Sequence, residues 1–352
     1  MGRIKISKYI RIVKRVKDYA VYHSLFGKLC LIDPDGIAFL ESFQNSRTIT
    51  DIIQANCRYK PSEIELYIHK LQARYFLVPE GFDEYELVEK NYRERKEYLK
   101  SGYLVRALQL ITSNTCNFRC KYCFVNSIYD PGKHSVFQRS ASNKQMSFEI
   151  AKMSIEKLLE LLKKNGNTCL NVEFFGGEPL TNWQVIESVL ETFGEGKGDD
   201  VEILYSITTN GSLITNKMAS TFKKKGVTVV ISFDSPKNTC RVLADGRNSI
   251  ELVNRSLEIL KENKNLVTFN SVISKETLET FDGKGLVDFA KYYNVSMIGL
   301  ILDLNLEFYN DHVNKEEVIE KVWETYKYGE TQGIPIVGYW HQIFSQIVYR
   351  QA

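Results

Sequence analysis

Three of the seven cysteines lie close together, at Cys116, Cys120 and Cys123. The remaining four are scattered along the chain: Cys30, Cys57, Cys169 and Cys240. An odd number of cysteines without a secretion signal argues against a disulfide framework. Thiolates are soft ligands for zinc, copper(I) and iron–sulfur clusters, so the clustered three indicate a metal site. The scattered four are typical of small buried residues.

The number of clustered thiols narrows the kind of metal site. A structural zinc site needs four ligands, usually from pairs of cysteines, and the chain has no second C-x2-C. A zinc site completed by His134 or another histidine stays open as an alternative. Three thiolates on a [4Fe–4S] cluster would instead leave one iron free to bind a small molecule.

A second motif, Gly176-Gly177-Glu178-Pro179, is the next expected strand end after the cysteines. Glycines let a backbone approach a ligand closely, and a carboxylate can receive an ammonium group. Such a string is also typical of a plain turn. Its position after the cysteine loop makes it a candidate binding site.

Alternating strand-like and helix-like segments carry both motifs. The expected strands are at 105–111, 170–175, 202–208, 228–233, 266–273 and 295–302. The expected helices are at 148–164, 183–193, 214–225, 249–264 and 283–293. This alternation predicts an α/β fold with a parallel sheet. Six strands fall short of a complete eight-stranded barrel, and functional groups should collect at the carboxyl ends of the strands.

With both motifs in place, residues 104–303 resemble a radical S-adenosylmethionine (radical SAM) enzyme. The resemblance implies a partial (β/α)6 barrel in which Cys116, Cys120 and Cys123 bind a [4Fe–4S] cluster. SAM would chelate the open iron through its amino and carboxylate groups. Reductive cleavage of SAM would give a 5′-deoxyadenosyl radical, which abstracts a hydrogen from the substrate.

The resemblance also implies a set of SAM contacts. Those for the SAM amino group are Gly176, Gly177, Glu178 and Pro179, and the one near the adenine is Tyr122. Weaker candidates for SAM binding are Asn210, Ser232 and Arg241. Their motifs resemble those of the peptide-modifying branch of the family, although Ser235 replaces the usual glycine. Asn210-Gly211 could equally be a simple turn, and Arg241 could be a solvated surface charge.

The sequence names no general base. Asp303 follows the sixth expected strand and is the catalytic candidate that we would test first. It could equally cap the helix expected after it.

The first 80 residues are expected to form a separate unit. Short strand-like segments lie at 9–13, 19–22, 29–32 and 76–79. Helices are expected to begin near Asp33 or Asp35, near Thr48 or Thr50, and at Pro61. Three helices and a small sheet resemble a winged helix-turn-helix, an α+β domain.

Beside such an enzyme, this unit resembles the recognition element that binds the leader of a ribosomally synthesised precursor peptide. That element adds the leader as an extra strand to a sheet edge. Candidate contacts are Leu29, Leu31, Tyr67 and Leu71, although the pattern favours a place in the core for them. A DNA-binding winged helix is the alternative, with these phosphate contacts: Arg11, Lys14, Arg15, Lys17 and Lys28.

Two further segments complete the expected organisation. Residues 81–103 are highly charged and predict a solvated linker helix. Residues 304–352 predict a helical extension that resembles the start of a SPASM or twitch region but contains no cysteine. The chain is therefore expected to be either a truncation of a longer enzyme or a member that needs a single cluster.

The composition limits the class of protein. The 352 residues carry a net charge of +3, and 43% are hydrophobic, which are ordinary globular values. The small charge argues against a nucleic-acid partner, and no apolar run reaches the about 20 residues of a membrane helix. A cytoplasmic protein is expected.

The expected function is radical modification of a precursor peptide, giving a thioether or carbon–carbon crosslink or another side-chain change. The expected partners are the precursor peptide and an external electron donor such as flavodoxin or ferredoxin. The alternatives are a sulfatase-type protein maturase and, outside the enzymes, a zinc-containing winged-helix regulator.

Overall fold

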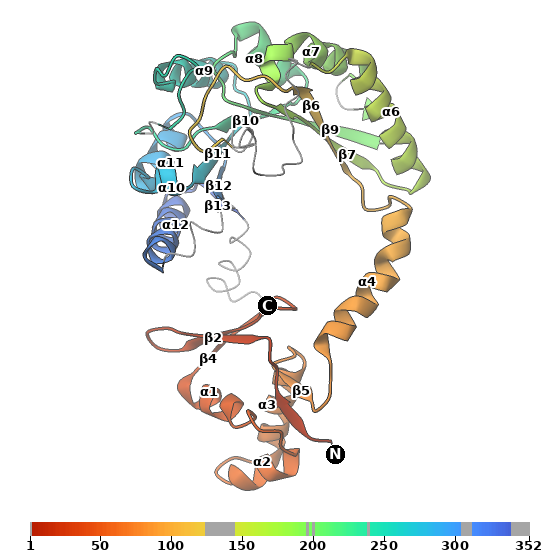
Figure 1. Cartoon of the computed structure of the whole chain (residues 1–352), viewed down its shortest axis with the longest axis vertical. Helices are drawn as coiled ribbons and strands as arrows, with labels where there is room; N and C mark the ends of the chain where they lie inside the picture. Colours follow the sequence, from red (N-terminus) through yellow and green to blue (C-terminus); the bar gives the residue numbers. More distant parts are fainter. Residues whose placement is uncertain are drawn as a thin grey trace, which may run out of the picture. The chain divides into compact units, whose positions relative to one another are not determined.

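The computed structural model describes residues 2–123, 145–194, 197–198, 201–237, 240–303 and 312–338. Two compact units divide the chain, and the boundary between Glu97 and Tyr98 falls inside helix α4 (Glu84–Lys100). We call them the N-terminal unit and the α/β unit (Figure 1).

A three-stranded antiparallel sheet forms one side of the N-terminal unit. It has the order β2 (Ile10–Lys14), β3 (Tyr19–His23), β4 (Lys28–Ile32). These are three of the four strand-like segments that the sequence predicts in this unit. A two-stranded sheet pairs β1 (Ile4–Ile6) with β5 (Leu77–Pro79). β1 was not predicted, because three residues are too few to show an alternating pattern.

Three helices of the N-terminal unit begin where local capping signals stand. Helix α1 (Pro34–Glu41) is capped by Asp33, whose carboxylate accepts the Gly36 N–H at 2.7 Å. Helix α2 (Ile49–Ala55) begins with a capping box between Thr48 and Asp51. Helix α3 (Pro61–Gln72) has proline in its first position. Their apolar faces bury a core with β3 and the segment before β5: Val21, Leu40, Phe43, Ile52, Ile68 and Phe76.

The predicted charged segment between the units forms α4. Most of its charged side chains are exposed, although Glu84 in the first turn is buried, and weak pairs join Lys90 to Glu94 at 4.0 Å and Arg93 to Glu89 at 3.9 Å. Exposed pairs of this kind add a few tenths of a kcal/mol each, so solvation rather than packing characterises this helix, about as predicted.

A curved sheet with parallel strand order β13-β12-β11-β10-β9-β7-β6 builds the α/β unit. A two-residue strand, β8 (Lys197–Gly198), adds antiparallel to β9. The bounds of the others are β6 Ala107–Ser113, β7 Cys169–Gly176, β9 Val201–Thr209, β10 Thr228–Ser232, β11 Val267–Ile273, β12 Ile298–Leu302 and β13 Ile336–Val337. The α/β fold with a parallel sheet predicted from the alternating pattern is confirmed, and so is the partial barrel that the resemblance implies.

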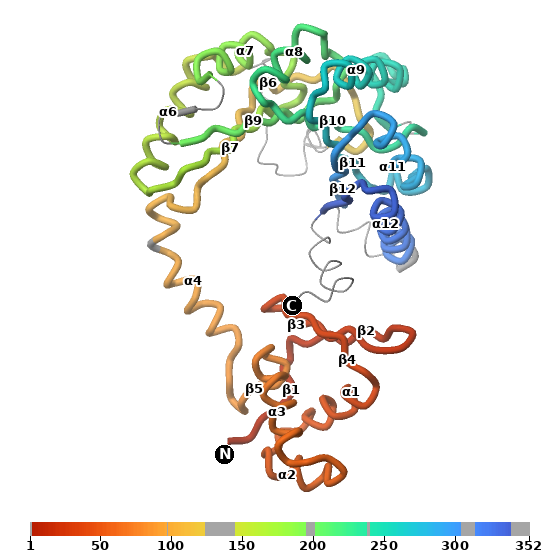
Figure 2. The backbone as a smooth tube through the Cα atoms, turned by 180° about the vertical axis from the view of Figure 1, so that it is seen from behind, coloured from red at the N-terminus to blue at the C-terminus, as the bar shows by residue number. Residues whose placement is uncertain are grey.

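Helices cover the outer side of this sheet, as both ribbon views show (Figures 1 and 2). Their bounds are α6 Phe148–Lys164, α7 Trp183–Thr192, α8 Asn216–Lys224, α9 Ile250–Glu262, α10 Lys275–Leu278, α11 Gly283–Tyr292 and α12 His312–Gln332. Along β9, Ile203, Tyr205 and Ile207 are buried, while Glu202 and Leu204 on the opposite face are exposed. The alternation therefore separates a helix-covered face from an accessible inner face.

Three details of the α/β unit differ from the expected strands. β6 begins and ends two residues later than predicted, and β12 begins only at Ile298, because Asn294, with φ of 55°, turns the chain after α11. The segment expected to be a helical extension also contributes β13, which pairs parallel with β12. A strand of only two residues has no recognisable period of apolar and polar side chains, so the sequence could not predict β13.

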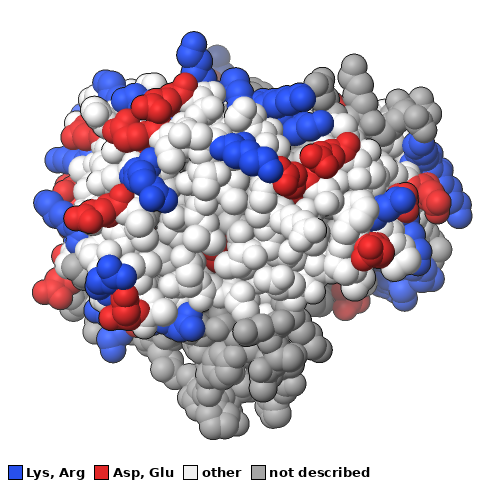
Figure 3. Space-filling model, turned by 90° about the horizontal axis from the view of Figure 1, so that it is seen from above, with Lys and Arg blue, Asp and Glu red and all other residues white. Residues whose placement is uncertain are grey.

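Two surface properties bear on what the protein can bind. No helix within the described ranges is long and apolar enough to cross a bilayer. On the face shown in Figure 3, Lys and Arg side chains are interspersed with Asp and Glu around a largely uncharged centre. This face therefore offers no extended field of one sign.

Candidate active site

The cysteine loop follows β6 and is fastened to a second loop far along the chain. The Arg119 N–H donates to the Val242 carbonyl at 2.7 Å, and the Lys121 N–H donates to the Cys240 carbonyl at 3.0 Å. Phe118, between the first two cysteines of the motif, is 1% exposed and pairs with Leu243. Backbone pairing therefore fixes the path of the loop.

The three clustered thiols line a single cavity of about 340 Å³ at the carboxyl ends of the strands. Its other walls come from β7, β9, β10, β11 and β12 or from the residues directly after them, and from Arg241, which lies farther along the chain after β10. The lining residues that the sequence singled out are Cys116, Cys120, Tyr122, Cys123, Gly176, Gly177, Asn210, Ser232, Arg241 and Asp303. The structure thus gathers these residues around one space, while Glu178 and Pro179 lie behind its wall.

Nitrogen donors approach two of the thiols. Cys116 Sγ accepts from the Phe118 N–H at 3.3 Å and lies 3.8 Å from the Asn210 side-chain amide. Cys120 Sγ lies 3.9 Å from Nη1 of Arg241. Burial raises the pKa of Cys116 and raises the pKa of Cys120 to about 11. Metal binding at these thiols would therefore release protons, and the nearby donors suit thiolate ligands.

Three thiols that line one cavity can each bind a different metal atom of a cluster. In the described part of the chain, no three His, Cys, Asp or Glu side chains converge as ligands of one metal ion. One ion needs all its ligands in a single coordination sphere. A [4Fe–4S] cluster places each thiolate on a different iron, so thiols spread around a shared cavity fit it.

Two glycines bring the loop after β7 against the cysteine loop. The Gly177 N–H donates to the Ser113 carbonyl and the Glu178 N–H to the Thr115 carbonyl, both at 2.8 Å. A Cβ at Gly176 or Gly177 would lie far inside van der Waals distance of those same carbonyl oxygens, and Gly176 has φ of +144°. The glycine motif therefore closes the gap between the two loops and presents its backbone to the cavity.

Glu178 is fully buried, and its carboxylate is held by the protein itself. Oε1 accepts from the Leu180 N–H at 3.0 Å and the Thr209 hydroxyl at 2.6 Å, and Oε2 accepts from the Asn210 N–H at 2.8 Å. Burial raises the pKa of Glu178, whereas these hydrogen bonds oppose the shift. The side chain joins the loop after β7 to the end of β9.

Asn210 does more than form the turn that its glycine neighbour allows. Its side-chain amide donates to Asn117 Oδ1 at 2.9 Å, and its Oδ1 accepts from the Ser212 N–H at 2.9 Å. Gly211 does have a positive φ, of 80°. The turn interpretation is thus correct for the backbone, and the side chain also connects β9 to the cysteine loop. Asn117 was missed, although its position inside the cysteine motif was a signal.

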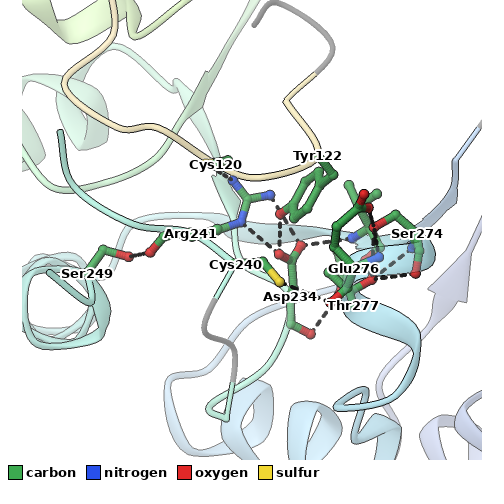
Figure 4. A network of polar contacts seen from close by, with 11 residues as sticks. Cys120, Tyr122, Asp234, Cys240, Arg241, Ser249, Ser274, Glu276 and Thr277 are labelled. Atoms are coloured by element: carbon green, nitrogen blue, oxygen red, sulfur yellow. Dashed lines mark hydrogen bonds and ion pairs between the residues drawn. The ribbon is translucent and has the colours of Figure 1, made fainter. Parts of the chain in front are cut away.

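A buried ion pair stands beside the cysteines (Figure 4). Arg241 Nε and Nη2 donate to the two Asp234 oxygens at 3.1 and 3.2 Å. The Tyr122 hydroxyl donates to Asp234, and the Arg241 guanidinium lies 5.4 Å from the centre of the Tyr122 ring. The side chain of Arg241 is 12% exposed, so the interpretation as a solvated surface charge is wrong. Asp234 had no assigned partner from the sequence.

The far wall of the cavity comes from β11 and β12. The register places Ser232 beside Asn270, and Val272 beside Ile301. Asp303 follows β12, and its N–H donates to the Ile273 carbonyl at 2.9 Å. The helix that Asp303 was expected to cap would begin within residues 304–311, which lie outside the described ranges. His134, the alternative zinc ligand, also lies outside them. The lining residues of the whole cavity that were not predicted are Phe118, Phe175, Thr208, Thr209, Asn270, Val272, Ile301 and Leu302.

The sequence of this chain matches known proteins over most of its length. Residues 110–284 match the family model of the radical SAM superfamily. The chain is 40% identical over 349 residues to the radical SAM cyclopropyl synthase TigE of Paramaledivibacter caminithermalis, covering 99% of this chain and 73% of that protein. The chain belongs to the radical SAM superfamily. It is therefore an enzyme that uses a [4Fe–4S] cluster and SAM, and the non-enzyme interpretation as a zinc regulator is wrong.

Two more distant radical SAM proteins match part of the chain. A cysteine-type anaerobic sulfatase-maturating enzyme of Clostridium perfringens is 29% identical over 162 residues, covering 45% of this chain and 40% of that enzyme. The structure of native anSMEcpe with bound AdoMet and Kp18Cys peptide has a TM-score of 0.54 at 20% identity, covering 70% of this chain and 67% of that one. The structural likeness shows the shared radical SAM fold.

Proposed function

We propose that this radical SAM enzyme forms a carbon–carbon bond within a ribosomally synthesised precursor peptide, closing a cyclopropane ring on a side chain. The observation that carries the proposal is the 40% identity to a cyclopropyl synthase, which extends over both units of this chain. This narrows the expected crosslink or side-chain change to one bond type. The enzyme would act in the cytoplasm.

In this proposal, Cys116, Cys120 and Cys123 hold the cluster. When bound, the cluster and SAM supply the 5′-deoxyadenosyl radical that abstracts a substrate hydrogen. The backbone of Gly176 and Gly177 receives the SAM amino group, because it faces the cavity. Glu178 and Pro179 hold that backbone in place from behind the wall.

The remaining SAM contacts are assigned to side chains that line the same cavity. Tyr122 would lie near the adenine, and Asn210, Ser232 and Arg241 would be further contacts of bound SAM, since all four line the cavity. The protein also keeps water away from the radical, since the cavity lies between the strand ends and the cysteine loop.

The far wall suits an aliphatic substrate side chain. Val272, Ile301 and Leu302 give it an apolar surface, and Asp303 stands at its edge. Closing a cyclopropane forms one C–C bond and removes two hydrogens, one as an atom and one as a proton with an electron. We assign the proton to the Asp303 carboxylate and the electron to a carrier of the flavodoxin or ferredoxin class.

The N-terminal unit would bind the leader of the precursor peptide. β4 lies at an edge of its sheet with Leu29 and Leu31 half-buried, so it can pair with an added strand. A cavity of about 440 Å³ opens beside it between α1 and α3, lined by Phe39, Tyr59 and Tyr67 among others. Leu71, 3% exposed, belongs to the core and is not a contact in this proposal.

The test is reconstitution with the precursor peptide. The 352-residue chain, reconstituted anaerobically and supplied with SAM and dithionite, should release 5′-deoxyadenosine and return a peptide lighter by two hydrogens. Alanine at any of the three clustered cysteines should abolish both products and the bound iron. A modified peptide whose mass corresponds to another chemistry would contradict ring closure.

A sulfatase-type maturase is the second candidate, favoured by the partial match to the Clostridium perfringens enzyme. It predicts oxidation of a cysteine in a sulfatase-derived peptide without any contribution from the N-terminal unit. Turnover of that peptide, with none of the precursor, would select this candidate.

A further inference from the structure

Arg241 is the one basic side chain among the described residues that line the cavity, and it faces a sulfur atom. Its Nη1 lies 3.9 Å from Cys120 Sγ. Guanidinium groups stay charged in proteins. A fixed positive charge therefore stands beside one of the thiols assigned to the cluster.

The direction of the guanidinium group is set by Asp234. A planar guanidinium that gives Nε and Nη2 to one carboxylate must point Nη1 the other way. In Figure 4, Nη1 points to Cys120 on the side away from Asp234. The two-point contact between Arg241 and Asp234, which we call the fork contact, thus determines that Nη1 is the guanidinium nitrogen that faces the Cys120 sulfur.

Several elements hold this arrangement in place. Asp234 follows β10 and also accepts the Val272 N–H of β11 at 2.9 Å. The Arg241 carbonyl accepts the Ser249 hydroxyl at 2.7 Å, at the start of α9. The Tyr122 ring lies against the guanidinium. Because the side chain is buried and fixed, its field at the sulfur is little screened by water.

We propose that Arg241 is a positioning residue that raises the reduction potential of the cluster through Cys120. This rests on the proposed cluster ligation. The one-electron reduction by an external donor adds negative charge to the cluster and its ligating sulfurs, and no bond is made or broken. A guanidinium donating to Cys120 stabilises the added charge. Asp234 partly neutralises the guanidinium and so limits the effect.

The test is an EPR-monitored redox titration of the reconstituted 352-residue chain without SAM. Arg241→Gln should shift the midpoint potential to more negative values, because charge and donor are lost. Arg241→Lys, which keeps the charge but cannot make the fork contact, should shift it less. Asp234→Asn should shift it to more positive values, since the guanidinium is no longer neutralised.

Arg119→Gln is the matched control. Arg119 lies in the same loop and loses the same charge, but it is exposed and donates to the Cys116 and Phe118 carbonyls. Its substitution should leave the midpoint potential in place. If both glutamine variants shifted the midpoint potential equally, the shift would come from the loss of any nearby positive charge. The inference that Arg241 acts through Cys120 would then be overturned.

The other outcomes are also decisive. A full iron content with an unchanged midpoint in Arg241→Gln would overturn the inference and leave Arg241 only a role in SAM binding. If that variant does not fold, Arg241→Lys and Asp234→Asn decide by the sign of their shifts. Full iron content in Cys120→Ala would instead refute the ligation itself, whatever the arginine variants show.

Discussion

Glu178 illustrates how a motif residue can act through its neighbours. Its carboxylate is enclosed by the Leu180 and Asn210 N–H groups and the Thr209 hydroxyl. Charge-assisted hydrogen bonds of this kind are worth more than neutral ones and compensate for the burial of the charge. At the scale of single residues, the buried Glu178 side chain therefore stabilises the backbone of the glycine motif that forms part of the cavity wall.

The residue-scale prediction concerns Glu178→Gln. Either orientation of the new amide turns its NH2 toward a backbone N–H, that of Leu180 or that of Asn210. We expect the free energy of unfolding of the cluster-free chain to fall by about 1–3 kcal/mol. Denaturant unfolding followed by tryptophan fluorescence measures this change.

Glu202→Gln is the control for Glu178→Gln. It replaces a carboxylate by the same amide, but Glu202 is exposed on β9 rather than buried. Equal unfolding free energies for the two variants would show that the carboxylate of Glu178 has no structural role.

At the scale of elements, the last residue of β3 joins the sheet of the N-terminal unit to the segment before it. His23 is buried, its Nδ1 accepts the Phe26 N–H at 3.2 Å, and its Nε2 lies 3.2 Å from the Ser7 hydroxyl. The accepting Nδ1 requires the neutral ring, with Nε2 as the donor. Burial lowers the pKa of His23 below its ordinary value of 6.5.

The element-scale prediction is an acid-sensitive N-terminal unit. Between the lowered pKa and 6.5 the unfolded chain binds more protons at His23 than the folded unit, so the free energy of unfolding falls as pH drops through this window. Hydrogen-exchange protection of residues 2–79, measured above and below the window and corrected for the intrinsic rate, should decrease at the lower pH.

His23→Gln should remove most of that dependence, whereas His69→Gln should keep it, because His69 is exposed on α3. A decline in protection that persists unchanged in His23→Gln would assign the acid sensitivity to other groups.

At the scale of the whole molecule, the chain has two separate cores. The N-terminal core includes Leu40, Phe43 and Ile68. The α/β unit buries its own residues between sheet and helices, such as Phe174 and Phe222. Separate cores make separate cooperative units, each with its own opening free energy.

The whole-molecule prediction follows from Ile68→Ala. Ile68 is fully buried, and its truncation should lower the stability of the N-terminal unit by about 2–5 kcal/mol. The protection of β7 and β9 against hydrogen exchange should be unchanged, because these strands belong to the separate core of the α/β unit.

Leu66→Ala, on the exposed side of the same helix at 56% exposure, should leave both units unaffected. Loss of protection in β7 or β9 in Ile68→Ala would show that the two units unfold together.

Local signals made much of the fold predictable. Asp33, Thr48 and Pro61 mark helix starts through contacts within a few residues, which a sequence displays directly. The six main parallel strands have enough apolar residues to show as periods or runs. β1 and β13 do not, because strands of two or three residues are held by their partners rather than by their own pattern.

The sequence by itself determined the spacing of the cysteines, the glycine motif and the strand ends on which both stand. Only the tertiary structure decided that Arg241 meets Asp234 and Cys120, that Glu178 lies behind the wall, and that Asp303 shares a cavity with the thiols. The physical reason is distance along the chain. Strand order and sheet curvature bring these groups together, and burial then fixes their partners, whereas a linear pattern records only near neighbours.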